Sequence, residues 1–248
     1  MNNHIIRISE DALIQICLNG LEAYSISHKG NNQQRNRLET YGLLWGYEVP
    51  LPGEKKLYSV EFVSIDTSAE QDHQSVDPND QSLELKRELI TSFWPHYDFL
   101  GDVHTHPYEH YSDVITIKGY ELSNADTKRI ENNTDYWSSY NYRAGLVLTV
   151  SRLQRKPRRG HRRLDDSTLE FVLGKYRLWL KGYIVYKENN QLKVSSADDS
   201  KVSLECSALL GLGGEYTGFS EVEREGCGCN KNNQSNDWSY IIKAIESH

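Results

Sequence analysis

The sequence predicts an α+β fold in which helices and strands form layers. Helical and strand-like segments follow one another without the regular alternation expected of a parallel barrel. Several segments are short runs rich in β-branched and aromatic residues, bounded by Gly, Pro and Asn. A chain of 248 residues with sixteen Tyr and five Trp also has enough apolar area for a sizeable core.

The first predicted elements are a short strand at residues 4–8 and a helix directly after it. Ser9 is a natural N-cap, and Glu10 and Asp11 place negative charge in the first turn, where it interacts favourably with the helix dipole. Cys17 lies on the apolar face of this helix and is expected to be a small buried residue.

The middle of the chain contains both strands and helices. Proline and glycine mark several of the boundaries, as at Pro95. The predicted elements are a hairpin of strands at 39–49 and 57–65, a helix at 83–94, a strand at 99–104, a helix from 123 to about 130, and strands at 143–152, 168–174 and 176–187.

Two regions are expected, a domain at residues 1–190 and a C-terminal extension at 191–248. The periodic pattern weakens after about residue 190. The extension contains a possible strand at 202–210, a Gly-rich stretch at 211–218, a Cys-Gly-Cys sequence at Cys227 to Cys229 and a short helix at 238–245.

Composition and charge argue against several classes of protein. A net charge of −7 is unlike the basic footprint of a nucleic-acid binder, so no nucleic acid is expected as a partner. The four cysteines do not form the regular framework of a secreted disulfide-rich protein. The first residues do not resemble a signal peptide, and no apolar run reaches the ~18 residues of a membrane span. A cytoplasmic location without membrane attachment is therefore the expectation.

The sequence Val103-His104-Thr105-His106-Pro107 predicts a metal site. Residues i and i+2 of an extended segment point to the same side, so both histidines can face one ion. A catalytic zinc site needs three protein ligands and an open position for water. Asp126, in the first turn of the helix that begins at Ser123, is the best candidate for the third ligand. Glu39 is the candidate general base, and Ser123 is a candidate hydrogen-bond donor to an oxyanion.

The residues quoted above resemble the signature of the JAMM/MPN⁺ zinc metalloproteases, in which a glutamate precedes His-x-His-Pro and Ser-x-x-Asp. The matching residues are Glu39, His104 to Pro107, and Ser123 to Asp126. The resemblance implies that two histidines and an aspartate bind Zn²⁺, that the glutamate is the acid/base, and that the serine steadies the tetrahedral intermediate. It also implies the MPN/JAB fold, an α-β-α layer similar to cytidine deaminases with a partly curled mixed sheet.

The same resemblance implies an isopeptidase. Members of this family hydrolyse amide or isopeptide bonds, often those that join ubiquitin or ubiquitin-like proteins to lysines. A ubiquitin-like protein or a peptide is then the expected substrate, and E1-like and E2-like proteins are expected as neighbours in the pathway.

One departure from the family pattern leaves the third ligand open. Fifteen residues, 108 to 122, separate Pro107 from Ser123, which is more than the family usually has. This predicts a longer loop over the site, where it could shape substrate access. Asp113 is the competing third ligand, although it lacks the Ser-x-x-Asp spacing.

The sequence also allows other interpretations of the function and of single segments. The chain could be an MPN scaffold without catalysis, or a His-x-His amidohydrolase or phosphoesterase barrel, although few histidines follow residue 110. His110 could be a further metal ligand, contact substrate or lie in solvent. The basic segment 152–163 could dock an acidic partner or nucleic acid, or be a solvated loop. Cys227 and Cys229 could form a soft metal site or belong to a flexible tail.

Overall fold

A computed structural model of the chain describes residues 4–30, 33–72, 75–132, 138, 143–154, 161–195 and 201–211. Its strands are β1 (His4–Ile8), β2 (His28–Gly30), β3 (Gln33–Arg35), β4 (Tyr41–Leu51), β5 (Lys55–Ile65), β6 (Glu70–Gln71), β7 (Val76–Asp77), β8 (Asp98–Tyr108), β9 (Ala144–Arg152), β10 (Arg162–Asp165), β11 (Thr168–Leu173), β12 (Tyr176–Glu188), β13 (Gln191–Val194) and β14 (Val202–Glu205). Its helices are α1 (Glu10–Ser25), α2 (Asp80–Phe93), α3 (Tyr111–Ile117), α4 (Asn124–Asn132) and α6 (Ala208–Gly211).

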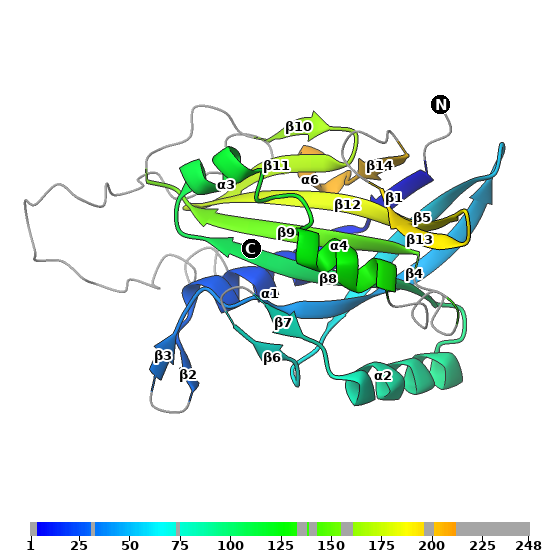
Figure 1. Ribbon diagram of the computed structural model, residues 1–248, viewed down its shortest axis with the longest axis horizontal. Helices are drawn as coiled ribbons and strands as arrows, with labels where there is room; N and C mark the ends of the chain where they lie inside the picture. The colour runs from blue at the N-terminus through cyan, green and yellow to red at the C-terminus, as the bar shows by residue number, and fades with distance from the viewer. Residues whose placement is uncertain are drawn as a thin grey trace, which may run out of the picture.

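One large sheet forms the centre of the molecule, and the remaining strands make two small hairpins (Figure 1). The strand order is β10-β11-β12-β9-β8-β4-β5-β1-β14, and β13 pairs with β12. The sheet is mixed: β8 and β9 are parallel, as are β1 and its two neighbours, whereas β4, β5, β11 and β12 make antiparallel pairs. This confirms the mixed α and β architecture with a curled mixed sheet.

The first helix forms as the sequence predicts. The Ser9 side chain accepts a hydrogen bond from the backbone N–H of Ala12 at 3.1 Å, and Glu10 and Asp11 occupy the first turn. Ala12, Leu13, Ile16, Cys17 and Tyr24 are buried against the strands, whereas Ile14 and Leu18 are exposed. Helix α1 therefore covers one face of the sheet.

The two faces of β8 carry different chemistry. Val103 belongs to the core that α1 covers. A Cβ added to Gly20 of α1 would come within 3.3 Å of the Thr105 methyl group, so Thr105 also faces this helix. Because successive side chains point to opposite faces, His104 and His106 face the other side. On that side Ile130 of α4 packs with Val147 of β9 and with Tyr183.

The structure differs from the predicted elements in three places. Strand β8 continues to Tyr108, beyond the predicted end at residue 104, and the predicted loop at 108–122 contains helix α3. The predicted strand at 202–210 is shorter, 202–205, and pairs with β1, so this part of the predicted extension belongs to the main sheet. In α2, Leu83 is buried as expected, but Leu85, Leu89 and Phe93 are exposed.

Within the part of the chain that the structure describes, every helix is too short or too polar to cross a membrane.

Candidate metal centre

Strand β8 presents two buried histidines at its carboxyl end. His104 is 1% exposed and His106 is 8% exposed. The ladder with β4 ends where Tyr41 pairs with His104, whereas the ladder with β9 continues through Pro107 opposite Val150. Proline cannot donate a backbone hydrogen bond, and it is accepted here because only one side of β8 is still paired. Pro107 therefore lies inside the strand, and the chain turns after Tyr108.

Helix α4 brings Asp126 to the same place. The Ser123 hydroxyl donates to Oδ2 of Asp126 at 2.6 Å, and the Asp126 backbone N–H donates to Oγ of Ser123 at 3.1 Å. The Ser123 backbone N–H also donates to this carboxylate at 3.0 Å. These reciprocal bonds form a capping box that fixes the helix start and the carboxylate together. Ser123 is therefore the N-cap residue of α4.

The distances between these groups suit a tetrahedral ion. Oδ2 of Asp126 lies 3.6 Å from Nε2 of His104 and 3.4 Å from Nε2 of His106. One ligand atom from each of the three residues lies within 4.8 Å of the others. In a tetrahedral zinc site with bonds of ~2.0–2.1 Å, ligand atoms are separated by roughly 3.3 Å. The buried His104-His106-Asp126 group could therefore hold a metal ion.

The second ring nitrogen of His106 is held by the segment between Pro107 and Ser123. Nδ1 of His106 lies 3.1 Å from the carbonyl oxygen of Gly119. A carbonyl only accepts, so Nδ1 carries the hydrogen and Nε2 is turned toward Asp126. The Thr149 hydroxyl donates to the same carbonyl at 3.1 Å. Metal-binding histidines are usually fixed in this way by a hydrogen bond from the other ring nitrogen.

In the described part of the chain, the ring of His104 is not fixed by a hydrogen bond of this kind. Neither of its ring nitrogens has a hydrogen-bond partner among the described residues, and both are buried. Leaving a buried polar nitrogen without a partner costs about 1–3 kcal/mol. An ion bound at Nε2 of His104 would remove part of this cost. The donor set and the unpartnered nitrogen thus fit a metal ion.

The protonation of the ligands reflects their proximity. Burial raises the pKa of Asp126, but the nearby imidazoles of His104 and His106 and the hydrogen bond from Ser123 outweigh it and hold that pKa far below its usual range. Burial lowers the pKa of His106, but Asp126, the negative charge of Glu39 and the Gly119 carbonyl together raise it. The group therefore contains an ionised carboxylate that favours a positive charge beside it.

Glu39 is 8% exposed and interacts electrostatically with His106 and Asp126 of the candidate ligand group. Its segment is fixed to β8 because Thr40 N–H donates to Oγ1 of Thr105 at 2.8 Å and Thr105 N–H donates to the Thr40 carbonyl at 3.1 Å. Burial raises the pKa of Glu39 to about 7, assisted by the charge of Asp126 and opposed by that of His106. A carboxyl group with this pKa can accept and return a proton at neutral pH.

The remaining predicted residues lie apart from this group. Asp113 is exposed in the first turn of α3 and is not part of the His104-His106-Asp126 group. His110 is bonded through Nδ1 to Gln154 at 2.9 Å. Cys227 and Cys229, residues 155–160 of the basic segment, residues 212–218 of the Gly-rich stretch and the helix at 238–245 lie outside the described residues.

Sequence reasoning missed several residues that support the site. Gly119 acts through a backbone carbonyl, which has no sequence signature. Thr149 is a polar residue in the apolar run of β9, and that contrast is a usable signal. Asp102, 2% exposed, precedes His104 by two positions and accepts a hydrogen bond from the Tyr183 hydroxyl at 3.0 Å. The Tyr183 ring lies over Gly145, where an added Cβ would come within 2.3 Å of it.

Fold and site together define a mixed α/β protein with a buried histidine-histidine-aspartate group suited to a metal ion. No protein-family model matches the chain, and no curated protein matches it.

Proposed function

We propose that this protein is a zinc-dependent hydrolase of amide or isopeptide bonds, a metallopeptidase of the JAMM type. The observation that carries the proposal is the buried His104-His106-Asp126 group with Glu39 beside it. Two imidazole nitrogens and one carboxylate oxygen form a donor set that zinc accepts, and three protein ligands leave one position for water or substrate.

Each residue has a role in this proposal. Zinc, when bound, acidifies a water molecule and polarises the substrate carbonyl. Glu39 takes the proton from the attacking water and passes it to the leaving amine, and its pKa of about 7 suits both transfers. Ser123 holds Asp126 in place through their hydrogen bonds. The donation from Ser123 to a substrate oxyanion stays a prediction, because its hydroxyl hydrogen is directed to Asp126.

The proposed substrate comes from the sequence resemblance. The family resemblance points to a ubiquitin-like protein joined to an amine, or to the tail of such a protein, acting in the cytoplasm beside E1-like and E2-like enzymes. The cleavage chemistry itself follows from the ligands and Glu39 and does not depend on which protein is cut.

Metal content is the first test. We expect about one zinc per chain in the purified protein, measured by elemental analysis, because a site with three well-placed ligands binds zinc tightly. His104→Ala and Asp126→Ala should lose most of it. Asp113→Asn is the matched control and should retain zinc, since Asp113 lies outside the ligand group. Loss of zinc in the control but not in Asp126→Ala would contradict the proposed ligands.

Hydrolysis is the second test. We expect release of aminocoumarin from a ubiquitin C-terminal amide or from a short peptide amide, abolished by a chelator and restored by zinc. Glu39→Gln should keep zinc and lose at least about a hundredfold in rate, the usual size of a general-base contribution. Full activity in this variant would require another base. Zinc binding without cleavage of either compound would favour a non-catalytic binding module.

A further inference from the structure

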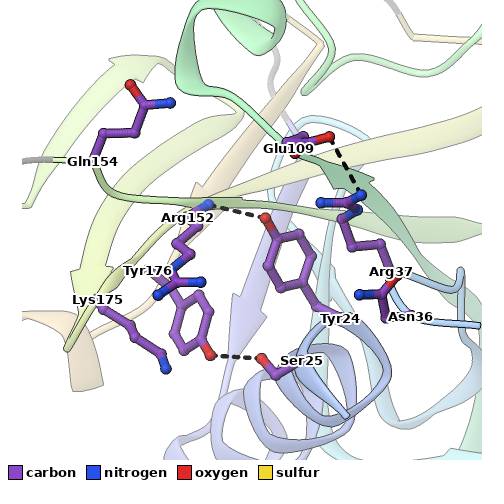
Figure 2. Close-up of a pocket in the computed structure, with 9 residues that line it drawn as sticks. All are labelled: Tyr24, Ser25, Asn36, Arg37, Glu109, Arg152, Gln154, Lys175 and Tyr176. Carbon is purple, nitrogen blue, oxygen red and sulfur yellow. Dashed lines mark hydrogen bonds and ion pairs between the residues drawn. The ribbon is translucent and has the colours of Figure 1, made fainter. Parts of the chain in front are cut away.

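A polar pocket lies at the carboxyl ends of β8 and β9. Its wall contains Glu109, which follows β8, Arg152, which ends β9, and Lys175 and Tyr176 at the β11–β12 turn. Tyr24 at the end of α1 closes one side (Figure 2). Because β8 and β9 are parallel, with Tyr108 opposite Ser151, their carboxyl ends open at the same edge of the sheet.

The tyrosines fix the shape of this pocket. The Tyr24 hydroxyl donates to the Tyr108 carbonyl at 2.7 Å and accepts from the Arg152 backbone N–H at 3.1 Å. It thereby ties α1 to the ends of both strands. The Tyr176 ring meets the Tyr24 ring edge-on at 5.8 Å, and its hydroxyl is 2.6 Å from Oγ of Ser25 (Figure 2). The wall is therefore preorganised for a ligand.

The pocket is positively charged in an acidic protein. Arg37, Arg152 and Lys175 are among its lining residues, and Glu109 is the carboxylate among them. Arg37 is paired with Glu109 at 3.3 Å, so three cations and one anion leave a formal charge of +2. The whole chain carries −7. This local reversal of sign favours a negatively charged ligand.

The size of the pocket limits what that ligand can be. Its volume is about 180 Å³, which corresponds to roughly six water molecules at ~30 Å³ each. Pockets for small-molecule ligands usually measure about 300–1,000 Å³. A single carboxylate-bearing group fits this space, and the rest of a larger ligand would lie outside it.

Two chain segments that line the pocket also carry residues of the metal centre. Arg37 precedes Glu39 by two residues, and Glu109 follows His106 by three. Arg37 adopts a left-handed backbone conformation with φ of 58°, held by the hydrogen bond from its N–H to the Tyr24 carbonyl at 3.2 Å. Strained conformations of this kind cluster at functional sites. A peptide lying across the metal centre can thus place one group in the pocket.

We propose that this pocket binds a carboxylate of the substrate, either an acidic side chain or a free C-terminus close to the bond that is cut. This inference rests on the proposed amide hydrolysis, because that function makes a peptide the molecule that passes between the two sites. The pocket would select substrates by charge and help to set which bond reaches the metal.

Peptide binding to the full chain tests the proposal. The Glu39→Gln variant is used so that no peptide is consumed, and binding is followed by fluorescence anisotropy. The probes are short labelled Gly/Ser peptides with one internal Glu and an amidated end, one internal Gln and a free carboxyl end, or one internal Gln and an amidated end. We expect at least one carboxylate peptide to bind about tenfold more tightly than the neutral peptide, the size of a charge-assisted hydrogen bond. The tighter of the two identifies the source of the carboxylate.

Substitutions in the pocket locate the effect. Lys175 is exposed, so Lys175→Glu should fold normally and should remove the preference for carboxylate. Arg152→Gln should weaken it. Lys187→Gln changes an exposed lysine at the other end of β12 and should leave it intact. Equal binding of all three peptides, or a preference that survives Lys175→Glu, would overturn the proposal. So would tighter binding of a labelled oligothymidylate that Lys175→Glu abolishes.

This test is separate from that of the catalytic function. Anisotropy requires neither zinc nor hydrolysis. A charge preference in a protein that contains no zinc would support the pocket and reject the hydrolase. Zinc-dependent cleavage without any charge preference would support the hydrolase and reject the pocket.

Discussion

Two groups of buried charged side chains lie in the same sheet and are completed in different ways. In the ion-pair cluster, Glu170 is fully buried and its carboxylate pairs with Arg162, 2.6 Å away, and with Arg177. In the metal cluster of His104, His106 and Asp126, one carboxylate lies close to two imidazoles. His104 has no hydrogen-bond partner among the described residues.

The difference separates a structural role from a functional one. A buried charge whose partners are all protein groups is neutralised once the chain is folded, so it contributes to the fold. Two imidazoles and one carboxylate whose ligand atoms lie within 4.8 Å of one another form a donor set that a metal ion can complete. The following predictions test this distinction, first by changing Glu170 in the ion-pair cluster and Glu39 beside the metal cluster.

The largest effect on stability is expected in the ion-pair cluster. Glu170→Gln leaves the buried guanidinium group of Arg177 and the exposed one of Arg162 without their carboxylate. Removing one partner of a buried ion pair costs about 3–5 kcal/mol. Urea unfolding of the metal-free protein would measure this loss. Glu205→Gln is the control, since its pair with Arg7 is exposed on both sides and should contribute under about 1 kcal/mol.

Beside the metal cluster, Glu39→Gln is expected to increase the stability of the metal-free protein rather than decrease it. The pKa of Glu39 is about 7 in the fold and 4.5 ordinarily, so the folded protein disfavours its ionised form. Stability of the metal-free protein is therefore lost as pH rises from 4.5 to 7. Glutamine stays neutral, so Glu39→Gln should stabilise the metal-free protein above this range by up to about 3 kcal/mol, at ~1.4 kcal/mol per pKa unit.

The pH series supplies the check on this second prediction. Unfolding of wild type and Glu39→Gln is compared across the range, and the difference should be close to zero at its acid end. If Glu39→Gln destabilised the protein at high pH as Glu170→Gln does, Glu39 would be a structural residue and the contrast between the clusters would fail.

The outline of the fold was accessible from the sequence because local signals and burial agreed there. Ser9 with Glu10 and Asp11 marks the start of α1 by capping chemistry alone. Helix α3 was missed because its residues Val114 to Ile117 are all β-branched and disfavour a helix. Tertiary contacts hold it instead: Val114 is fully buried, and Tyr111 stacks on Trp179 with ring centroids 5.7 Å apart.

In the candidate site too, local sequence patterns predict some residues, whereas others depend on tertiary packing. Spacing on one strand is sufficient to predict His104 and His106 as neighbours, and the capping sequence predicts the geometry of Asp126. The burial of Glu39 depends on how its segment packs beside β8 and α4, which no local pattern encodes. The Gly119 carbonyl and the pocket cations come from segments far apart in the chain, so only the folded structure brings them together.

Added metal should stabilise one cluster and leave the other unchanged. A ligand at a hundred times its Kd stabilises the folded state by about 2.7 kcal/mol. We expect zinc to raise the melting temperatures of wild type and of Glu170→Gln, with a similar stabilisation free energy in both. It should have little effect on the melting temperature of Asp126→Asn. Asp113→Asn should respond as wild type does. A zinc response that persists in Asp126→Asn would place the ion elsewhere in the chain.

The smallest effect is expected on zinc affinity, from a change at Thr149, which contacts the carbonyl that holds His106. Thr149 donates to the Gly119 carbonyl that also accepts from Nδ1 of His106. Thr149→Val keeps the branched shape and removes the hydroxyl, so the carbonyl is held less firmly and zinc should bind about tenfold more weakly. Competition with a chromogenic chelator would measure the change. Ser151→Ala is the matched control on β9, because the buried Ser151 hydroxyl has no hydrogen-bond partner among the described residues. Equal zinc affinity in both variants would mean that the Gly119 carbonyl is positioned by its own segment alone.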